Sequence, residues 1–582
     1  MGIPSFFRHI ISRYADIIVE SPSYNGTGTN EICHRLFIDF NCILHKFAQE
    51  KSVQCVNLAL PLLEEEIMQE SIKYVKQMYD FIKPLEFMFV AIDGVCPRAK
   101  MTQQRKRRFI SNWKKSLVKE DPSYIKDVNQ QWDSNVITPG TSFMLKFDHK
   151  IKAAFQNEIK SGKIILSGSS EFGEGEHKIY HCLKSLEKEN KNDIIYGLDA
   201  DIILLSLINL DEHKKQTIKL MREYPEFHTT FKTQNQNQNQ KKNQNNDFMF
   251  LNINTLSSSL FDFYSQQNRN HAGEPIFIEN LLHDPMSQKN AFVRDYVILC
   301  TFIGNDFLPS LSYLKVHNNG IDNIIREYMK IGENLKQFLV SHNGEINDIF
   351  LKKILKSLSI NEDEFMNKAQ QNNLKRQPDV RQFLNIKSYE KIFKELDNFP
   401  LYHKVLPNTI DCSKKEWRVQ YYQNLFHGDL VSDICKNYLE GLQWVVNYYI
   451  NHDSFHDWHY LYCYSPTISD LYNYLEFEIG LKAKMCIQDV FENCKKIRIN
   501  NVEFESIMKN GLLQLFMVLP SSSSHLIPDQ QKAAIMHDIE KGCVHFYPRF
   551  FKISTFLKSY LWECSAVLPD IDMNYLHQVL QS

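Results

Sequence analysis

The chain has 582 residues, 43% of them hydrophobic and 23% charged, which is normal for a globular protein of at least two packed units. Its formal net charge of −2 excludes nucleic-acid binding through overall charge, so any such binding requires a local basic patch. The thirteen cysteines have no CxxC spacing and no short Cys/His cluster, which argues against a zinc site or a disulfide framework and favours reduced thiols.

Four short apolar runs in the first third of the chain predict buried parallel strands, at residues 36–40, 87–92, 163–166 and 194–198. The helical stretches between them are long enough for right-handed crossover connections. An aspartate ends or directly follows three of the runs: Asp39, Asp93 and Asp199. A helix N-cap would explain any one of them alone. Because ligands of open α/β sheets bind beyond the carboxyl ends of the strands, we expect the three side chains to converge.

A strongly basic segment follows the second of these strands. Residues 93–109 read DGVCPRAKMTQQRKRRF, and a helix that begins near Pro97 would carry four polar side chains on one face, at i, i+4, i+7 and i+8: Lys100, Gln104, Arg107 and Arg108. Most basic helical runs are solvated faces. Arginine is, however, a bidentate donor to phosphate and lysine a point charge, so this face is a candidate phosphate site.

Further acids occur at intervals along the first half of the chain. GEGEH contributes Glu174 and Glu176, GLDAD adds Asp201 beside Asp199, and IGNDFLP contributes Asp306. With Asp39 and Asp93 they make seven carboxylates, which one cleft tolerates only when divalent cations neutralise them. Oxygen ligands without soft ones favour Mg²⁺ or Mn²⁺ over zinc. Two such ions about 4 Å apart suit phosphodiester hydrolysis.

Composition divides the chain into two regions. Residues 234–246 (QNQNQNQKKNQNN) are of low complexity and predict a disordered surface insertion. A second polar stretch, at 361–379, predicts a linker, beyond which the chain is helical and rich in aromatic residues. We therefore expect a first domain over residues 1–355, a linker over 356–380 and a helical region over 381–582.

Several long motifs resemble the 5′→3′ exoribonucleases of the Xrn type. They are MGIPSFFRHIISRY, DFNCILH, DGVCPRAKMTQQRKRRF, GEGEHKI, YGLDADI and FIGNDFLPSL. Beyond the linker, YLEGLQWVVNYY, WHYLYCYSPTISD and LFMVLPSSSSHLIP are similar to the second conserved region of that family. The resemblance implies an α/β fold, with a parallel-sheet catalytic domain like those of PIN and flap nucleases and a mainly helical second region packed against it.

The resemblance also implies a role for each site residue. The seven acids would be ligands, direct or through water, of two Mg²⁺ or Mn²⁺ ions. Lys100, Gln104, Arg107 and Arg108 would form the pocket for a 5′-monophosphate, whereas Arg105 and Lys106 are expected to be solvated charges or contacts to the RNA backbone. His45, in DFNCILH, and Trp458, in WHYLYCYSP, would stack on the first bases, which is sequence-tolerant binding.

The implied activity is processive hydrolysis of single-stranded RNA with a 5′-monophosphate, which releases nucleoside 5′-monophosphates. One alternative is a flap-type structure-specific endonuclease, but such enzymes follow their last aspartate with a helix-hairpin-helix rich in GxGxK. Here Asp306 is followed by FLPSLSYLKVHNNGID. Another alternative is a catalytically inactive RNA-binding scaffold, which would tend to lose some of the acids, yet all seven positions are filled.

Targeting and assembly are less constrained by the sequence. No apolar run approaches the roughly 18 residues of a membrane helix, and no signal-peptide pattern opens the chain. We expect a monomer without membrane contact, in the cytoplasm or alternatively the nucleus, whose substrates come from decapping factors.

Overall fold

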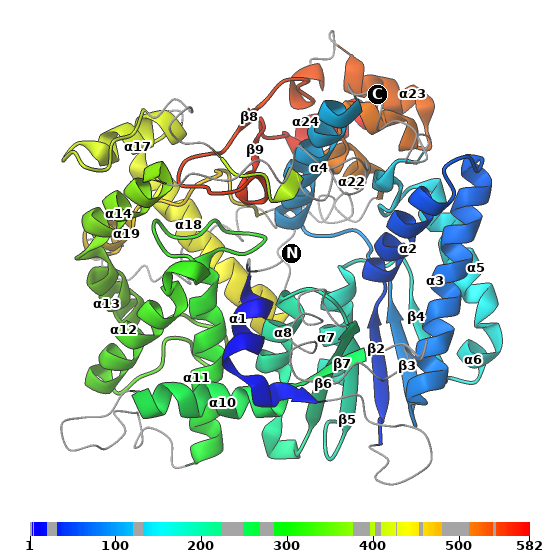
Figure 1. Ribbon diagram of the computed structural model, residues 1–582, viewed down its shortest axis with the longest axis horizontal. Coiled ribbons are helices and arrows are strands. Elements are labelled where there is room, and N and C mark those ends of the chain that lie inside the picture. Colours follow the sequence, from blue (N-terminus) through cyan, green and yellow to red (C-terminus); the bar gives the residue numbers. More distant parts are fainter. Residues whose placement is uncertain are drawn as a thin grey trace, which may run out of the picture.

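A computed structural model describes most of the chain (Figure 1). The residues described are 3, 5–19, 32–119, 132–223, 248–267, 284–375, 396–401, 409–426, 428–452, 458–479, 511–538 and 543–581. The insertion expected to be disordered, at 234–246, lies outside these ranges. No helix in the described ranges is both long enough and apolar enough to cross a membrane.

A seven-stranded sheet forms the centre of the first half of the chain. Its strands are β1 (Ile18–Val19), β2 (Arg35–Asp39), β3 (Phe87–Ala91), β4 (Ile164–Ser167), β5 (Asn192–Tyr196), β6 (Thr217–Glu223) and β7 (Phe248–Asn252). The order is β1-β7-β6-β5-β2-β3-β4, in which the five strands from β6 to β4 are parallel and β7 is antiparallel to both neighbours. The four predicted strands are therefore confirmed, and β1, β6 and β7 extend the sheet on one side.

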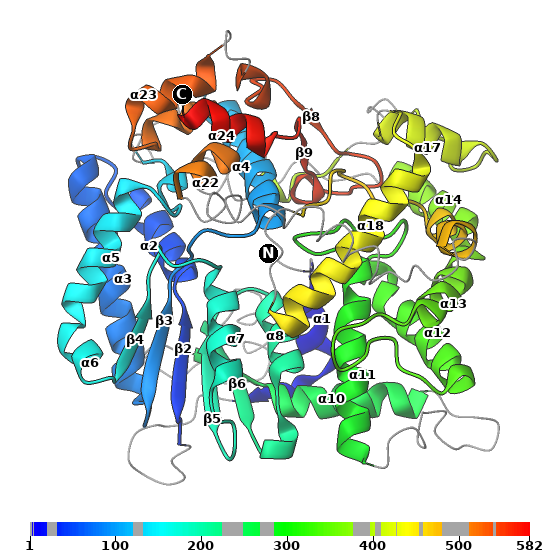
Figure 2. The same ribbon diagram turned by 180° about the vertical axis from the view of Figure 1, so that it is seen from behind.

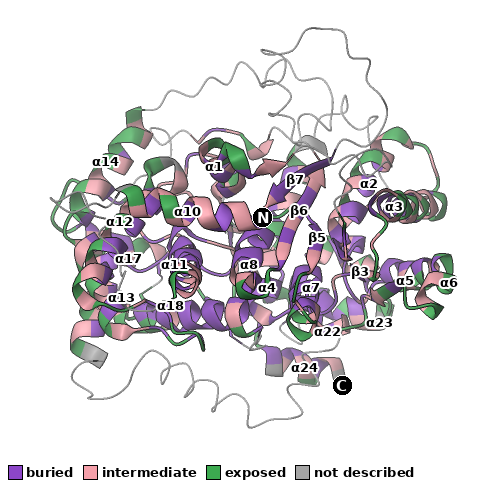
Figure 3. Ribbon diagram, turned by 90° about the horizontal axis from the view of Figure 1, so that it is seen from below, coloured by how far each residue is buried: buried purple, intermediate pink, exposed green. Residues whose placement is uncertain are grey.

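Helices cover both faces of this sheet. They are α1 (Phe6–Arg13), α2 (Asn41–Gln54), α3 (Leu60–Ile82), α5 (Ser142–Ala154), α6 (Gln156–Lys160), α7 (Gly175–Ser185), α8 (Asp201–Asn209) and α10 (Ile253–Gln267). The basic helix α4 (Arg98–Lys119) lies beyond the strand ends instead, and α11 (Pro285–Cys300) packs against α8 and α10 (Figure 1). Leu36 and Ile38 pack into one core with α2, α3 and α5, while Phe37 between them packs into another with α7 and α8. Because successive side chains of a strand point to opposite faces, burial on both faces requires the continuous apolar runs seen in the sequence. In Figure 3 the strands are mostly buried, whereas α3 and α6 at one side of them carry many exposed residues.

The strand order reverses between β2 and β5. From β2 the chain steps outward through β3 to β4, then returns through α7 to β5, which pairs with the opposite side of β2. In parallel sheets ligands bind beyond the strand ends at such a reversal. Asp39 ends β2 and Asp199 follows β5, so the fold brings predicted site residues to this position.

The second half of the chain is mainly helical, as expected. Its elements include α12 (Gly320–Leu335), α13 (Asp348–Ser359), α14 (Glu362–Lys375), α17 (Trp417–Leu425), α18 (Val431–Val446), the π-helical turn η7 (Asn447–Asn451) and α19 (Ile468–Asn473). One hydrophobic core runs from the sheet into these helices. The stretch expected to be a linker is helical over its described part: it forms the end of α13 and all of α14, where Met366 and Gln370 are buried. Buried residues at i and i+4 explain why this polar segment packs as a helix.

The end of the chain packs against the basic helix α4. It contains α22 (Gly511–Val518), α23 (Gln530–Ala533), α24 (Met573–Gln581) and a two-stranded ribbon of β8 (Lys552–Ile553) and β9 (Ala566–Val567). Both ribbon views show α4 beside α22 (Figures 1 and 2). The Arg105 guanidinium donates to the carbonyl oxygen of Pro569 at 2.7 Å and to that of Phe546. The expectation of a solvated Arg105 is thus wrong: it is 5% exposed and anchors α4 to the C-terminal segment.

Candidate active site

The seven predicted acids lie on elements that meet at the carboxyl edge of the sheet. Asp39 is the last residue of β2, Asp93 follows β3, and Asp199 follows β5. Glu174 precedes α7, Glu176 lies in its first turn, and Asp201 begins α8. Asp306 lies in the loop beyond α11. We call this set the acid cluster: Asp39, Asp93, Glu174, Glu176, Asp199, Asp201 and Asp306.

Close backbone packing brings the first acids together. The Asp93 carboxylate accepts a hydrogen bond from the Gly175 amide at 2.6 Å, and the Asp93 amide donates to Asn41 Oδ1 at 3.1 Å. A Cβ on Gly175 would lie 2.5 Å from Asp39 Oδ1 and 3.2 Å from Asp93 Oδ1. Gly175, the second glycine of GEGEH, therefore lets the first turn of α7 approach both carboxylates. A larger residue at this position would displace them.

Lys100 from α4 reaches into the acid cluster. Its ammonium lies 2.7 Å from Glu174 Oε1 and 2.9 Å from Asp306 Oδ2, and the residue is 8% exposed. Against the effect of burial, the two carboxylates raise the pKa of Lys100 well above its usual value. At Asp306, burial acts to raise the pKa of the carboxyl and the positive charge of Lys100 acts to lower it. The net result is a pKa below the usual range. Lys100 thus bridges two acids that are far apart in the sequence, Glu174 before α7 and Asp306 beyond α11.

Three of the remaining acids, Asp39, Glu176 and Asp201, are disfavoured as anions by burial and by neighbouring acids. Burial, followed by the charges of Asp93 and Asp199, raises the pKa of Asp39 well above its usual value. Burial also raises the pKa of Glu176, with added repulsion from Asp201. The pKa of Asp201 rises to about 7 through burial and then the charge of Asp306. These mutual effects show that the carboxylates lie within electrostatic reach of one another.

The donor set of the acid cluster fits hard divalent cations. All seven side chains offer carboxylate oxygens, the ligands that Mg²⁺ and Mn²⁺ prefer, and their repulsion is what a bound cation relieves. Within the described ranges, no three His, Cys, Asp or Glu side chains have the geometry of a preformed metal site. The fit therefore rests on the chemistry of the donors and their convergence.

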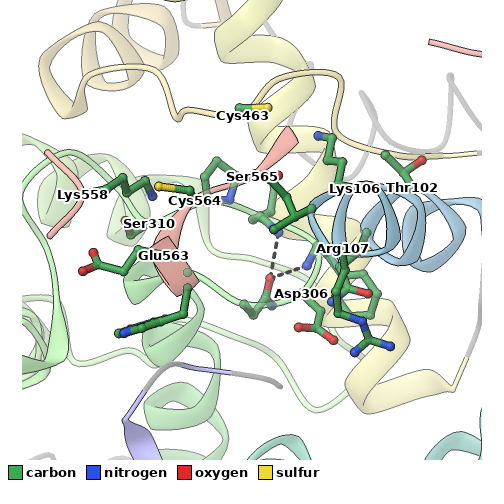
Figure 4. A pocket seen from close by; sticks show the side chains of 18 of the residues that line it. Thr102, Lys106, Arg107, Asp306, Ser310, Cys463, Lys558, Glu563, Cys564 and Ser565 are labelled. Atoms are coloured by element: carbon green, nitrogen blue, oxygen red, sulfur yellow. Dashed lines mark hydrogen bonds between the residues drawn. The ribbon is translucent and has the colours of Figure 1, made fainter. Parts of the chain in front are cut away.

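A cavity of about 770 Å³ lies beside α4. We call it the basic cavity; its cationic lining residues are Lys106, Arg107, Arg108, Lys114, Lys315 and Lys558. His45 and Asp306 also line it, so Asp306 belongs both to the acid cluster and to this wall. Figure 4 shows Arg107 and Asp306 next to each other in the cavity.

Two of the four predicted phosphate ligands line the basic cavity. Arg107 is exposed to it. Arg108 is 9% exposed, and its Nη1 is buried without a hydrogen-bond partner among the described residues. Burial and the neighbouring charge of Arg107 lower the pKa of Arg108 to about 9. A buried guanidinium nitrogen without an acceptor is costly, and an oxyanion in the cavity would satisfy it.

The other predicted binding residues are distributed differently. Lys100 and Gln104 are not among the residues that line the basic cavity, and the Gln104 Oε1 atom is buried without a partner in the described structure. The side chain of His45 is exposed at the cavity wall. Loss of hydration within the cavity, and then the positive charges of Arg107 and Arg108, lower the pKa of His45 to about 4. Its imidazole is therefore neutral at pH 7, as suits stacking on a base.

Trp458 lies in the hydrophobic core. It is 1% exposed and stacks on Trp444, with ring centroids 5.3 Å apart. A Cβ on Gly441 would lie 2.5 Å from its ring, so α18 packs closely against it. The structure thus brings His45 to the cavity but not the indole of Trp458.

Sequence reasoning missed Tyr448. Its hydroxyl donates to Glu174 Oε2 at 2.7 Å, and its ring stacks on His177 at 4.7 Å and on Trp444 at 5.0 Å. Tyr448 lies in the π-helical turn η7, a feature that is common at functional sites. The only signal was the NYY sequence that ends the quoted motif YLEGLQWVVNYY, and the extra residue of a π turn leaves no mark in the sequence.

The chain matches two family models that together span most of its length. Residues 1–224 match the model described as "XRN 5'-3' exonuclease N-terminus", and residues 287–405 and 408–582 match "Xrn1 helical domain". The second match begins well before residue 381, and the predicted domain boundary stays a prediction.

Curated relatives align with the whole chain. The 5'-3' exoribonuclease 1 of Schizosaccharomyces pombe is 25% identical over 100% of this chain and 48% of its own length. The human 5'-3' exoribonuclease 1 is 25% identical over 100% of this chain and 34% of its own length. The 5'-3' exoribonuclease 2 of Arabidopsis thaliana is 25% identical over 98% of this chain and 66% of its own length. The chain thus spans half or less of the first and second of these relatives, and it belongs to the Xrn family of 5′→3′ exonucleases.

Proposed function

We propose that the protein is a 5′→3′ exoribonuclease that hydrolyses single-stranded RNA from a 5′-monophosphate end. The observation that carries the proposal is the position of Asp306, which pairs with Lys100 in the acid cluster and also lines the basic cavity beside Arg107. A hydrolytic centre and a phosphate-binding wall thus adjoin at one residue. This arrangement suits an enzyme that holds the end of a strand and cuts next to it.

Membership of the family implies a divalent metal, and we assign two Mg²⁺ or Mn²⁺ ions to the acid cluster. When bound, such ions activate water and stabilise the charge that develops on a phosphodiester. The protein contributes the placement of the carboxylates. Gly175 and Asn41 fix the backbone around Asp93, and Tyr448 orients Glu174.

The end of the substrate binds on the other side of Asp306. Arg107 and Arg108 would hold the 5′-monophosphate, with Gln104 and Lys100 behind them on the same helix. His45 would stack on the first base as a neutral ring. After each cut the new 5′-phosphate would move into the same position, which makes degradation processive. A role for Trp458 would require its ring to leave the packing against Trp444, so it forms no part of the proposal.

The chemistry of the substrate indicates where it comes from. A reaction that exposes a 5′-monophosphate, such as decapping, must precede this one. Every cysteine in the described ranges is free, which agrees with a reducing compartment, and we place the protein in the cytoplasm as a monomer.

The test compares matched RNAs that carry a 5′-monophosphate or a 5′-triphosphate, with and without EDTA. We expect the monophosphate RNA to yield nucleoside 5′-monophosphates from the first time point, the triphosphate RNA to persist, and EDTA to stop the degradation of the monophosphate RNA. Equal degradation of the two RNAs would contradict the end-binding role of Arg107 and Arg108. Cleavage only at internal duplex junctions would favour a flap-type endonuclease, and RNA binding without turnover would favour an inactive scaffold.

A further inference from the structure

A buried lysine beside the acid cluster has no role in the function above. Lys178 lies on α7, two residues after Glu176, and is 8% exposed. Within the described ranges its ammonium donates to two main-chain carbonyl oxygens, at 2.7 Å to Ile92 and at 2.8 Å to Gly168. Burying an ammonium costs folding free energy even when it is hydrogen-bonded, and an apolar side chain of similar volume avoids that cost. The lysine is therefore explained better by the site than by stability.

One of these hydrogen bonds holds the peptide group that precedes the Asp93 side chain. The carbonyl of this group belongs to Ile92 and accepts from Lys178, while its N–H belongs to Asp93 and donates to Asn41 Oδ1 at 3.1 Å. Because a peptide group is planar, contacts at both of its ends fix its orientation, and with it the direction in which the Asp93 side chain leaves the backbone. The carboxylate itself then accepts from the Gly175 amide at 2.6 Å.

The other hydrogen bond joins two loops that lead to acids of the cluster. The Gly168 carbonyl lies just after β4, at the start of the loop that leads to Glu174. Farther along, the Gly94 amide donates to the Gly173 carbonyl at 2.9 Å, which fastens this loop to the one after β3. A Cβ on Gly94 would lie 1.6 Å from the backbone of the loop after β4 and 3.3 Å from the Lys178 ammonium. The ammonium thus fills the space where the two strands end and the two loops begin.

From these contacts we propose that Lys178 is a positioning residue of the acid cluster. It would hold Asp93 and Glu174 in the mutual arrangement that divalent cations require, without contacting the substrate. The inference rests on the proposed function, because the metal ions are assigned there to the acid cluster. Side chains that orient metal ligands from outside the ligand set typically affect metal affinity about 10- to 100-fold.

The first test measures metal binding in the absence of RNA. Mn²⁺ is titrated into the metal-free wild type, Lys178→Met and Lys178→Arg, and the free ion is followed by electron paramagnetic resonance. Methionine has a similar length but no donor, so we expect Lys178→Met to weaken Mn²⁺ binding about tenfold. Lys178→Arg keeps the charge and the donors and should lose less. Unchanged Mn²⁺ affinity in Lys178→Met would overturn the proposal.

The matched control is Lys188→Met. The Lys188 ammonium also donates to a main-chain carbonyl, that of Asn209 at 3.0 Å. Asn209 is the last residue of α8, at the opposite end of that helix from Asp201. We expect Lys188→Met to bind Mn²⁺ like the wild type. An equal loss of Mn²⁺ affinity in Lys188→Met and Lys178→Met would mean that either change loosens the fold in general, and it would count against a specific role of Lys178.

The second test separates positioning from stability. The Mg²⁺ concentration for half-maximal degradation of a 5′-phosphorylated RNA is compared with the melting temperature and with RNA affinity in EDTA. Positioning predicts that Lys178→Met raises the required Mg²⁺ concentration about tenfold and leaves RNA affinity within about twofold. A lower melting temperature with an unchanged Mg²⁺ requirement would show a merely structural role and overturn the proposal. If Lys178→Met does not fold, the same measurements on Lys178→Gln decide.

These outcomes are distinct from a failure of the proposed function. If the wild type binds Mn²⁺ and degrades 5′-monophosphate RNA but Lys178→Met does both equally well, only the assignment of Lys178 is wrong. If the wild type neither binds Mn²⁺ nor degrades RNA, the exoribonuclease proposal is wrong, and the assignment of Lys178 is overturned with it.

Discussion

The acid cluster and the basic cavity adjoin along one helix, α4, but they balance their charges differently. In the acid cluster, Lys100 bridges Glu174 and Asp306 within 3 Å, so part of the charge is neutralised inside the protein. In the basic cavity, Arg108 has a buried Nη1 without a partner in the described structure. The first region is organised in advance by its own side chains, whereas the second depends on an anion from outside. The difference assigns chemistry to one region and recognition of the strand end to the other.

The largest expected effect comes from breaking the acid cluster. Asp201→Asn keeps the size of the side chain but removes its carboxyl group, whose pKa is raised to about 7 by burial and by the charge of Asp306. Because metal binding stabilises the transition state by several kcal/mol, we expect single-turnover cleavage to fall on the order of 10³-fold. RNA affinity should stay within about twofold, since the basic cavity is intact.

The matched control is Asp262→Asn, which alters an exposed acid on α10, outside the acid cluster. Unchanged cleavage in the control and a large loss in Asp201→Asn would sharpen the division between the two regions. Normal cleavage by Asp201→Asn would remove that residue from the proposed metal ligands.

A smaller effect is expected from the basic cavity. Arg107 is exposed, so Arg107→Ala should leave the fold intact while it removes a charge-assisted hydrogen bond of about 1.5–3 kcal/mol to the 5′-phosphate. We expect the preference for 5′-monophosphate over 5′-hydroxyl RNA to fall about 10- to 100-fold, measured as the ratio of the two kcat/KM values.

Lys115→Ala is the control for this variant, because Lys115 lies on the same helix but is not among the residues that line the cavity. If both variants weakened the two RNAs by the same factor, Arg107 would act on the RNA backbone in general, and the contrast between the regions would be lost.

The two regions also differ in how well the sequence predicted them. The acid cluster follows from local patterns, because apolar runs place Asp39, Asp93 and Asp199 near strand ends and a parallel sheet aligns those ends. The basic cavity is built from segments that are far apart in the sequence. No local pattern shows that α4 packs on the C-terminal segment, and so Arg105 was expected in solvent although it is 5% exposed.

Aromatic residues show the same limit. The motif around Trp458 predicted a stacking residue, but whether a tryptophan is buried depends on which helix packs over it, here α18 at Gly441. Trp562 is exposed in the lining of the basic cavity, but it lies on a short turn, where exposure has no periodicity that a sequence pattern could reveal. Lys100 lay on the predicted face of α4, yet its long side chain reaches past that face to the acids.

The smallest predicted effect tests how far the acid cluster is organised by its own side chains. Tyr448→Phe removes the hydroxyl that donates to Glu174 Oε2 at 2.7 Å, a hydrogen bond to a charged group inside the core. The ring keeps its stacking on Trp444 and His177, so the fold should persist. We expect kcat to fall about three- to tenfold with an unchanged KM, since Glu174 loses one of its two fixed contacts. Tyr296→Phe on α11 is the control, because that hydroxyl is buried without a hydrogen-bond partner among the described residues and has none of the seven acids near it. An equal loss in both variants would mean that the tyrosines act through packing, and that Lys100 alone orders Glu174.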